Sequence, residues 1–455
     1  MRLQKLFFVL SLLVCVAMSS AQRADVSIGV TDKGQVPSIA VPNIRGLVGT
    51  ENESTFNTTL WNDLDASGQL RMVSKSFYPR TAPRRAEDIQ ASNDNLPVDP
   101  GDRGLWLIGW SDPPVSARYL VFGTLEESSD RLVLNGWIYD VTMEQIQAAY
   151  VFGKRYYGSL DEAGARRIAH DFSRDILQNL GLGIGLAGSR VYFRTDRTGF
   201  TEIFSMDYDG ANLKQHTKYN NIVMTPAVSP DGSRLAFTTF VEGTPKIYIH
   251  SLETGRRLIF YNQDASLNAT PDFSIDGKSL AFASSASGRS QIYMADLDGR
   301  NLRRISYSRS LEIDPVINPR TGSQIAFTSG RSGVPQVYLM DVDGANVRKL
   351  SGGQGDAVQP SWDPKGEQIT FSWTRGFEPG NYNIFVMNVA TQQLVQLTHG
   401  AGRNENPVFS PSGTHIVFSS NRSGGTQIWT MRADGTQIRR LTTQGRNTAP
   451  VWAIR

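Results

Sequence analysis

Residues 229–239 read S-P-D-G-S-R-L-A-F-T-T, and this pattern recurs through the C-terminal part of the chain. Close copies of its second half are K-S-L-A-F-A-S at 278–284 and S-Q-I-A-F-T-S at 323–329, and looser copies begin at positions 190, 367 and 414. The six copies share a phenylalanine, with successive spacings of 44, 45, 45, 44 and 47 residues: Phe193, Phe237, Phe282, Phe327, Phe371 and Phe418. A period in the mid-forties with four strand-like segments per unit is typical of the blades of a β-propeller.

The copies share an order of turns. A turn such as S-P-D-G at 229, S-I-D-G at 274 or S-P-S-G at 410 leads into the phenylalanine strand, and a D-x-D-G turn at 207, 296 or 341 leads into a basic fourth strand. Asp-Gly between apolar runs predicts a tight hairpin, because Gly supplies the positive φ that such a turn needs. We expect a proline to open the first strand of each unit, where a missing amide proton is tolerated: Pro226, Pro271, Pro315, Pro360, Pro407 and Pro450.

The two ends of the array predict how the ring closes. The first copy has no proline-led strand before Arg190, whereas the last segment, A-P-V-W at 449–452, is a first strand with nothing after it. Together they complete one blade, which predicts an all-β six-bladed propeller over 187–455, closed by a C-terminal strand. Closure removes the free sheet edges that an open array would expose. An open solenoid would need polar caps, and the terminal Trp452 is apolar.

Residues 22–183 lack the repeat and predict a small α/β domain. Ile168, Phe172, Ile176 and Leu180 recur every four residues and predict an amphipathic helix that ends at glycine. Further segments have a strand or helix pattern or read as a polar, proline-rich loop: strands at 36–41, 70–73, 118–125, 132–141 and 146–157, helices at 52–67 and 161–180, and the loop at 75–100. Helices and strands in this mixture favour an α/β layer domain placed before the propeller.

Residues 1–21 read as a signal peptide. Basic residues precede an apolar core at 6–18, which is too short for a comfortable membrane span, and S-S-A follows at 19–21. A lipoprotein signal ending at Cys15 is the alternative, but Val14 stands where that signal has a small residue. Cys15 is the only cysteine, so the mature chain would have no disulfide, which is common in a bacterial periplasm.

Catalytic and metal-binding motifs are weak. The sequence has no G-x-S-x-G, so the hydrolase domain that accompanies oligopeptidase propellers is absent. Its five histidines have no metal-ligand spacing, and the D-x-D-G runs lack the later acid of an EF-hand. We therefore predict no catalytic residue, metal ligand or cofactor, although a calcium ion in the central channel stays open. We interpret the Arg-Arg pairs at 303–304 and 439–440 as a solvated rim, and with a net charge of +3 we expect no nucleic-acid partner.

The chain resembles the TolB family, the periplasmic propeller proteins of the Tol–Pal cell-envelope system. The resemblance rests on the helix I-A-H-D-F-S-R-D-I-L-Q-N-L-G at 168–181, S-R-V-Y-F at 189–193, the S-P-D-G-S-R-L-A-F repeats and the final A-P-V-W. It extends over essentially the whole mature chain. The sequence departs from the family pattern at L-G-I-G, 182–185, where the family usually has a Thr-Gly junction, and in the loop at 75–100.

The resemblance implies a non-enzymatic periplasmic scaffold, peripheral to the membranes. It would link TolA at the inner membrane to the peptidoglycan-associated lipoprotein, Pal, at the outer membrane. Such a scaffold supports envelope integrity, protein import and outer-membrane invagination during cell division. TolA would bind the N-terminal segment at 22–34, through Asp25, Val26, Ser27, Ile28 and Val30.

The resemblance also implies that Pal binds at one mouth of the propeller. We expect the residues at or just before each proline to surround this mouth: Thr225, Asn268, Thr270, Asp314, Gln359 and Asn406, with Ala449 at the closing strand. A polar ring with a single carboxylate suits a hydrogen-bonded protein contact. The alternative function is an exported propeller enzyme acting on polysaccharide or peptide in the channel, and it would need several convergent acids or metal ligands there.

Overall fold

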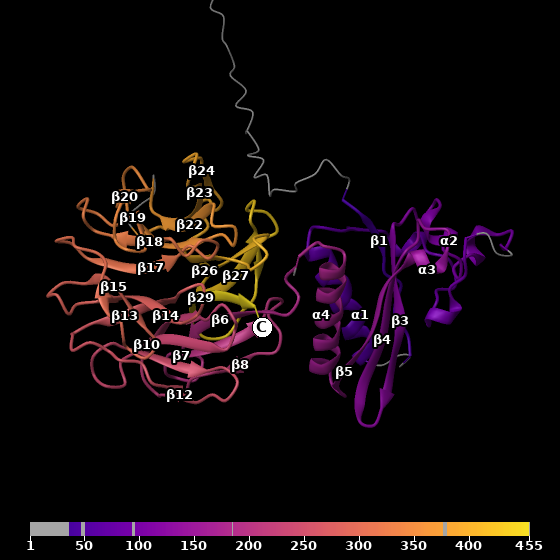
Figure 1. Cartoon of the computed structure of the whole chain (residues 1–455), viewed down its shortest axis with the longest axis horizontal. Helices are drawn as coiled ribbons and strands as arrows, with labels where there is room; N and C mark the ends of the chain where they lie inside the picture. The colour runs from indigo at the N-terminus through magenta and orange to yellow at the C-terminus, as the bar shows by residue number, and fades with distance from the viewer. Residues whose placement is uncertain (1–35, 47–50, 93–95, 184, 376–379, 455) are drawn as a thin grey trace, which may run out of the picture.

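The computed structural model describes residues 36–46, 51–92, 96–183, 185–375 and 380–454. The predicted signal peptide, Cys15 and the predicted TolA segment at 22–34 lie outside these residues. Within the described part of the chain, no helix is both long and apolar enough to cross a membrane. Figure 1 shows a propeller beside a smaller α/β domain, as the sequence predicts.

The N-terminal domain is a five-stranded sheet with the strand order β2-β1-β3-β4-β5. β1 lies between β2 and β3 and pairs parallel to both, and β3, β4 and β5 form an antiparallel meander. Two helices pack together on the sheet, with α4 on the side of the propeller (Figure 1). The elements are β1 (Ser38–Ala40), α1 (Glu51–Ala66), β2 (Arg71–Met72), β3 (Tyr119–Ser128), β4 (Arg131–Asp140), β5 (Tyr150–Ser159) and α4 (Glu162–Asn179).

Helix α4 forms where the sequence predicts it. Asp161 caps its start by accepting a hydrogen bond from the backbone N–H of Gly164 at 2.7 Å. Gly181, at φ +71°, follows its end in a left-handed conformation that favours glycine. Phe172 is fully buried against Gly136 of β4, where a Cβ atom would lie 2.7 Å from the ring. The predicted apolar stripe therefore seats α4 on the sheet.

A second apolar core covers the other face of the sheet, and the sequence did not predict it. The short helix α2 (Ile108–Ser111) buries Trp110 against Leu120 and Phe122 of β3. In the described residues of the predicted loop at 75–100, the helical structure is limited to single turns of 3₁₀ helix. The prediction that the whole of 146–157 is a strand is wrong at its start. There α3 (Ile146–Ala149) makes one turn that buries Ala149, and β5 begins afterwards.

The propeller consists of six four-stranded sheets, which confirms the predicted six-bladed ring. All strands within a blade are antiparallel, and the outermost strands are only two or three residues long. Blade 1 contains β29 (Asn447–Ile454), β6 (Ser189–Thr195), β7 (Glu202–Asp207) and β8 (Lys214–Gln215); blade 2 contains β9 (Val223–Val228), β10 (Arg234–Thr239), β11 (Lys246–Ser251) and β12 (Arg257–Leu258); blade 3 contains β13 (Asn268–Phe273), β14 (Ser279–Ser284), β15 (Gln291–Asp296) and β16 (Arg303–Arg304); blade 4 contains β17 (Glu312–Ile317), β18 (Gln324–Ser329), β19 (Gln336–Asp341) and β20 (Arg348–Lys349); blade 5 contains β21 (Ala357–Trp362), β22 (Gln368–Trp373), β23 (Asn383–Asn388) and β24 (Leu394–Gln396); blade 6 contains β25 (Asn404–Phe409), β26 (His415–Ser423), β27 (Gly425–Arg432) and β28 (Arg439–Arg440).

The C-terminal strand closes the ring as predicted. β29 pairs antiparallel with β6, and Trp452 lies opposite Val191. The indole N–H of Trp452 donates to Ser189 Oγ at 2.8 Å, and its ring packs in the core that contains Phe193. One strand from the end of the chain thus joins three from the start of the array.

The repeat prolines lie within the innermost strands, so the prediction that they open these strands is wrong. In β13, Ala269 pairs with Ala283 and Asp272 with Ala281, which leaves Thr270 and Pro271 together opposite one residue. This is a β-bulge, and Thr270 has φ +50° there. Because the bulge takes Pro271 out of the ladder, its missing N–H forfeits no interstrand hydrogen bond.

Candidate protein-binding face of the propeller

The six residues before the repeat prolines meet at the propeller axis. All have φ between 48° and 58° and line one cavity of about 120 Å³. We name them the axial ring: Thr225, Thr270, Asp314, Gln359, Asn406 and Ala449. The structure thus brings together Ala449 and five of the residues expected at the propeller mouth.

Asn268 does not belong to this ring, which corrects its predicted place at the mouth. It is fully buried, and its amide N–H donates to the carbonyl of Gln263 at 2.9 Å. In a regular strand Asn268 and Thr270 would share a face because they are two residues apart. The positive φ of Thr270 breaks this alternation, so only Thr270 lines the axial cavity.

Hydrogen bonds hold the polar ring residues to their own blade or to a neighbouring one. Gln359 Oε1 accepts from Ser372 Oγ at 3.0 Å and from the backbone N–H of Asn406 at 3.0 Å. In blade 2, the hydroxyls of Thr225 and Thr238 lie 2.7 Å apart. These bonds fix the orientation of the ring's polar side chains, which favours a preorganised docking surface.

Two carboxyl groups lie along the channel. Burial raises the pKa of Asp314 to about 6, although the hydroxyl of Thr328 acts in the opposite direction. Burial likewise raises the pKa of Asp272 to about 7. The hydrogen bond that its Oδ2 accepts from the backbone N–H of Ile317 at 2.8 Å acts to lower this pKa. Asp272 lines a wider cavity of about 460 Å³, whose apolar lining includes Phe273 and Trp362. Neither cavity lining contains histidine or cysteine.

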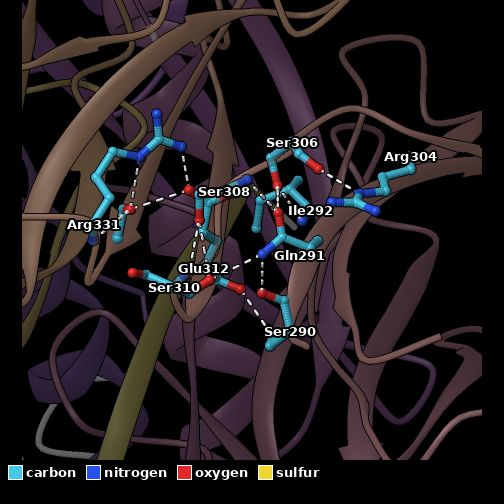
Figure 2. Close-up of polar contacts among 10 residues, drawn as sticks. Ser290, Gln291, Ile292, Arg304, Ser306, Ser308, Ser310, Glu312 and Arg331 are labelled. Atoms are coloured by element: carbon cyan, nitrogen blue, oxygen red, sulfur yellow. Dashed lines mark hydrogen bonds and ion pairs between the residues drawn. The ribbon is translucent and has the colours of Figure 1, made fainter. Parts of the chain in front are cut away.

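Arginines in the hairpins between the second and third strands lie over the aromatic pair of their blade. Arg331 lies 4.9 Å from the Tyr338 ring centroid, and Arg422 lies 5.1 Å from that of Trp429. Arg331 also bonds to Glu312 (Figure 2). Its Nε donates to Ser329 Oγ at 3.0 Å. These arginines could not be singled out from the sequence, because a Ser-x-Arg hairpin reads as an ordinary polar turn.

The loop that leads into blade 4 is held by Gln291, which lies beside Glu312 in Figure 2. Gln291 Nε2 donates to the carbonyl of Ser310 at 2.9 Å, and its Oε1 accepts from the backbone N–H of Ser308 at 2.9 Å. Glu312 is fully buried and accepts from Ser329 Oγ at 3.1 Å. The Glu312–Arg331 pair is therefore an internal structural contact between an inner strand and a hairpin.

A buried polar cluster joins the two domains. We name it the interdomain clamp, and it consists of Asp63 of α1, Arg166 and His170 of α4, and Asp207, Tyr208 and Asp209 of blade 1. His170 Nδ1 lies 2.8 Å from Asp63 Oδ2, and the Tyr208 hydroxyl donates to Asp63 Oδ1 at 2.6 Å. A second link is the ion pair of Arg166 with Asp209 at 2.6 Å. Asp63 therefore receives one bond from each domain.

His170 is charged more readily in this cluster than in water. Burial acts to lower its pKa, but the carboxylates of Asp63, Asp209 and Asp207 outweigh burial and raise the pKa above its usual value. Its Nε2 is buried without a hydrogen-bond partner, 3.9 Å from Asp207 Oδ2. The sequence gives no sign of this contact, because Asp63 and His170 are 107 positions apart in the chain.

The arrangement of the clamp accommodates a proton better than a metal ion. Ligand atoms of His170, Asp207 and Asp209 lie within 4.8 Å of one another. However, Arg190 donates to Asp207 at 2.7 Å and Arg166 to Asp209 at 2.6 Å. Because guanidinium groups already neutralise both carboxylates, a divalent cation here would face two adjacent positive charges.

Comparison with known proteins identifies relatives of both the sequence and the fold. A family model described as TolB beta propeller domain matches residues 183–376 and 351–455. A TolB homologue of Chlorobium chlorochromatii is 37% identical over 142 residues, which are 31% of either chain. The Tol-Pal system protein TolB of Desulfosudis oleivorans is 29% identical over 57% of this chain and 55% of its own length.

The matched region thus spans about a third to a half of these curated relatives. The crystal structure of TolB from Acinetobacter baumannii has a similar fold, with a TM-score of 0.70 and 24% identity over 92% of this chain and 97% of that one. The family model alone covers more than half of the chain. By its propeller, this protein belongs to the TolB family, whose curated members include proteins of the Tol-Pal system.

Proposed function

We propose that this chain is a non-enzymatic periplasmic scaffold that links TolA to Pal. The axial ring carries the proposal. Five of its six residues present polar, hydrogen-bonded side chains, and the sixth is Ala449 of the closing blade. Asp314 is the only ionisable group of the ring. Such a surface suits a shape-matched contact with a folded protein. Acid–base catalysis would need paired groups with a free reacting geometry, whereas the ring oxygens of Thr225, Gln359 and Asn406 already hydrogen-bond within the propeller.

In this proposal Pal docks on the axial ring, and TolA binds the segment at 22–34. An extended segment of this kind can add itself to a sheet or groove of its partner, and becomes ordered on binding. The interdomain clamp would hold the two binding regions in one body. Loss of the protein would then weaken the outer membrane and delay its invagination at division.

Binding of the purified mature chain to the periplasmic domains of Pal and TolA from the same organism tests the proposal. We expect Thr270→Arg to abolish Pal binding by placing bulk and charge on the ring, and deletion of 22–34 to abolish TolA binding. The fold should tolerate arginine there, because β-branched threonine is the less favourable residue at φ +50°. Thr321→Arg, on an exposed turn at the opposite side of the blades, is the matched control. A folded T270R protein with wild-type Pal affinity would place the contact elsewhere.

A further inference from the structure

The closing blade differs from the other five beside the axial ring. Arg194 of β6 lies opposite Thr448, as Thr328 lies opposite Ile313 and Ser372 opposite Val358 in blades 4 and 5. By register, blades 1 to 6 therefore present Arg194, Thr238, Ala283, Thr328, Ser372 and Ser419 behind the ring. Only the closing blade has a charged residue at this position.

The hydroxyls at this position normally hold the ring residue of the same blade. Thr238 bonds to Thr225 at 2.7 Å, and Ser419 donates to Asn406 Oδ1 at 3.1 Å. In the closing blade the ring residue is Ala449, whose methyl group offers no acceptor. In place of a hydroxyl that bonds to a polar ring residue, the closing blade thus has the long, charged side chain of Arg194 behind the small side chain of Ala449.

Positive charge accumulates at this seam. We define the seam arginines as Arg194, Arg197 and Arg446. Burial, and then the charge of Arg446, lower the pKa of Arg194, and only Asp196 acts in the opposite direction. Asp196 Oδ1 accepts the backbone N–H of Arg446 at 2.7 Å. Arg197 donates to Thr195 and lies over Phe193, and burial lowers its pKa too.

The guanidinium of Arg194 has no hydrogen-bond acceptor or ion-pair partner in the described part of the chain. Blade 4 offers a comparison for this seam. Its Arg331 occupies the hairpin position that Arg197 has in blade 1, and Glu312 of the same blade neutralises the charge of Arg331. At the seam, the inner strand begins with the neutral Asn447, so no such acid is supplied. A half-buried guanidinium without an acceptor is a site prepared for an anion from outside.

We propose that the seam between β29 and the first hairpin is a carboxylate-binding subsite for an aspartate or glutamate side chain of the protein that docks on the axial ring. A carboxylate matches the fork of a guanidinium in a bidentate geometry, and docking would exclude water from the pair. The neighbouring ring is neutral apart from Asp314, so the site fits one acidic side chain on a polar surface rather than a polyanion. The inference rests on the proposed function, because it assigns a contact within the same docking face.

Replacement of Arg194 by a neutral residue of similar length tests this subsite. The probe is the periplasmic domain of Pal from the same organism, titrated calorimetrically at 50 and 300 mM NaCl with the wild type and R194M. We expect a rise in Kd of about tenfold for R194M at low salt and a weaker salt dependence. R320M, which removes an exposed arginine from the turn at the opposite side of blade 4, should bind like the wild type.

The outcomes separate the subsite from the function on which it rests. If the wild type does not bind Pal, the proposed function fails and the subsite fails with it. If the wild type binds and a folded R194M binds equally well with the same salt dependence, the function stands and the subsite is wrong. Thermal unfolding of both proteins establishes that R194M is folded.

A cross-link gives a second readout that a purely structural arginine would not produce. In R194K, a carbodiimide should condense the introduced amine with the partner's carboxylate, forming an amide while the carbodiimide takes up the lost water as its urea. We expect the linked peptide to join position 194 to an aspartate or glutamate of Pal, and R320K to give no such peptide. Retained binding of R194K without this cross-link would contradict the proposal.

Discussion

Substitution of Asp63 by asparagine should weaken the attachment of the N-terminal domain to the propeller. Both carboxylate oxygens of Asp63 are buried and occupied, by His170 at 2.8 Å and by the hydroxyl of Tyr208 at 2.6 Å. Asparagine has nearly the same shape and still offers Tyr208 an acceptor. The variant therefore removes the negative charge without creating a cavity.

The size of the stability loss follows from the two hydrogen bonds whose acceptor becomes neutral. A hydrogen bond to a charged group contributes about 1.5–3 kcal/mol, whereas a neutral one contributes about 1 kcal/mol. With two bonds to Asp63, we expect a loss of about 2 kcal/mol in the free energy of unfolding near pH 6. For a domain of this size, that loss lowers the melting temperature by about 4–8 °C. Asp65→Asn, an exposed neighbour on α1, is the matched control.

The effect should depend on pH. Because the pKa of His170 is raised in the folded protein, its imidazolium contributes fully below the ordinary pKa of about 6.5. This contribution is lost as the pH rises through the raised folded value. Differential scanning calorimetry should therefore show the largest difference between wild type and D63N near pH 6 and a smaller one near pH 9. A difference that does not vary with pH, or no difference at pH 6, would refute the assignment of an imidazolium to the clamp.

Three further changes test other parts of the fold. Deletion of 448–455 removes most of the closing strand and should lower the melting temperature far more than loss of a free tail; a truncated protein that melts like the full chain would disprove the closure. Asp314→Asn should raise the stability by about 1–2 kcal/mol at pH 8 in chemical unfolding, with no difference at pH 4. The raised pKa means that the protonated carboxyl's stabilising contribution is lost above about pH 6, and equal stability at pH 8 would contradict this burial effect. Glu312→Gln should destabilise the propeller by about 2–3 kcal/mol, because Arg331 loses its counter-charge, and an unchanged urea midpoint would show that the pair contributes nothing.

The architecture of the propeller could be predicted because one local pattern is written six times. Each phenylalanine of the repeat is buried in the second strand of its blade, so the spacing alone located the sheets. The N-terminal domain has no such repetition. Its second core depends on Trp110 from a single helical turn, and one turn leaves no periodic signal in the sequence.

The candidate site was only partly predictable, because bulges and long-range contacts are not periodic. The prolines marked the axial ring, yet a strand-opening proline and a proline in a bulge look alike in sequence, and this placed Asn268 wrongly. The clamp was missed for another reason. Asp63 and Tyr208 are 145 positions apart and ordinary in their local context, so only the packing of the N-terminal domain against blade 1 reveals their contact.

In a repeat protein, departures from the repeat distinguish structural positions from candidate binding positions. Glu312 stands where β13, β25 and β29 begin with asparagine. Arg331 of the same blade neutralises its charge, so Glu312 needs no partner from outside the fold. Arg194 departs from the small residues of the other five blades, and no acid in the described part of the chain forms an ion pair with it, although the nearby Asp196 acts to raise its pKa. The first departure should therefore affect stability when mutated, and the second should affect binding. Comparing E312Q with R194M in both assays tests this distinction directly, because each variant is expected to be nearly silent in the assay that detects the other.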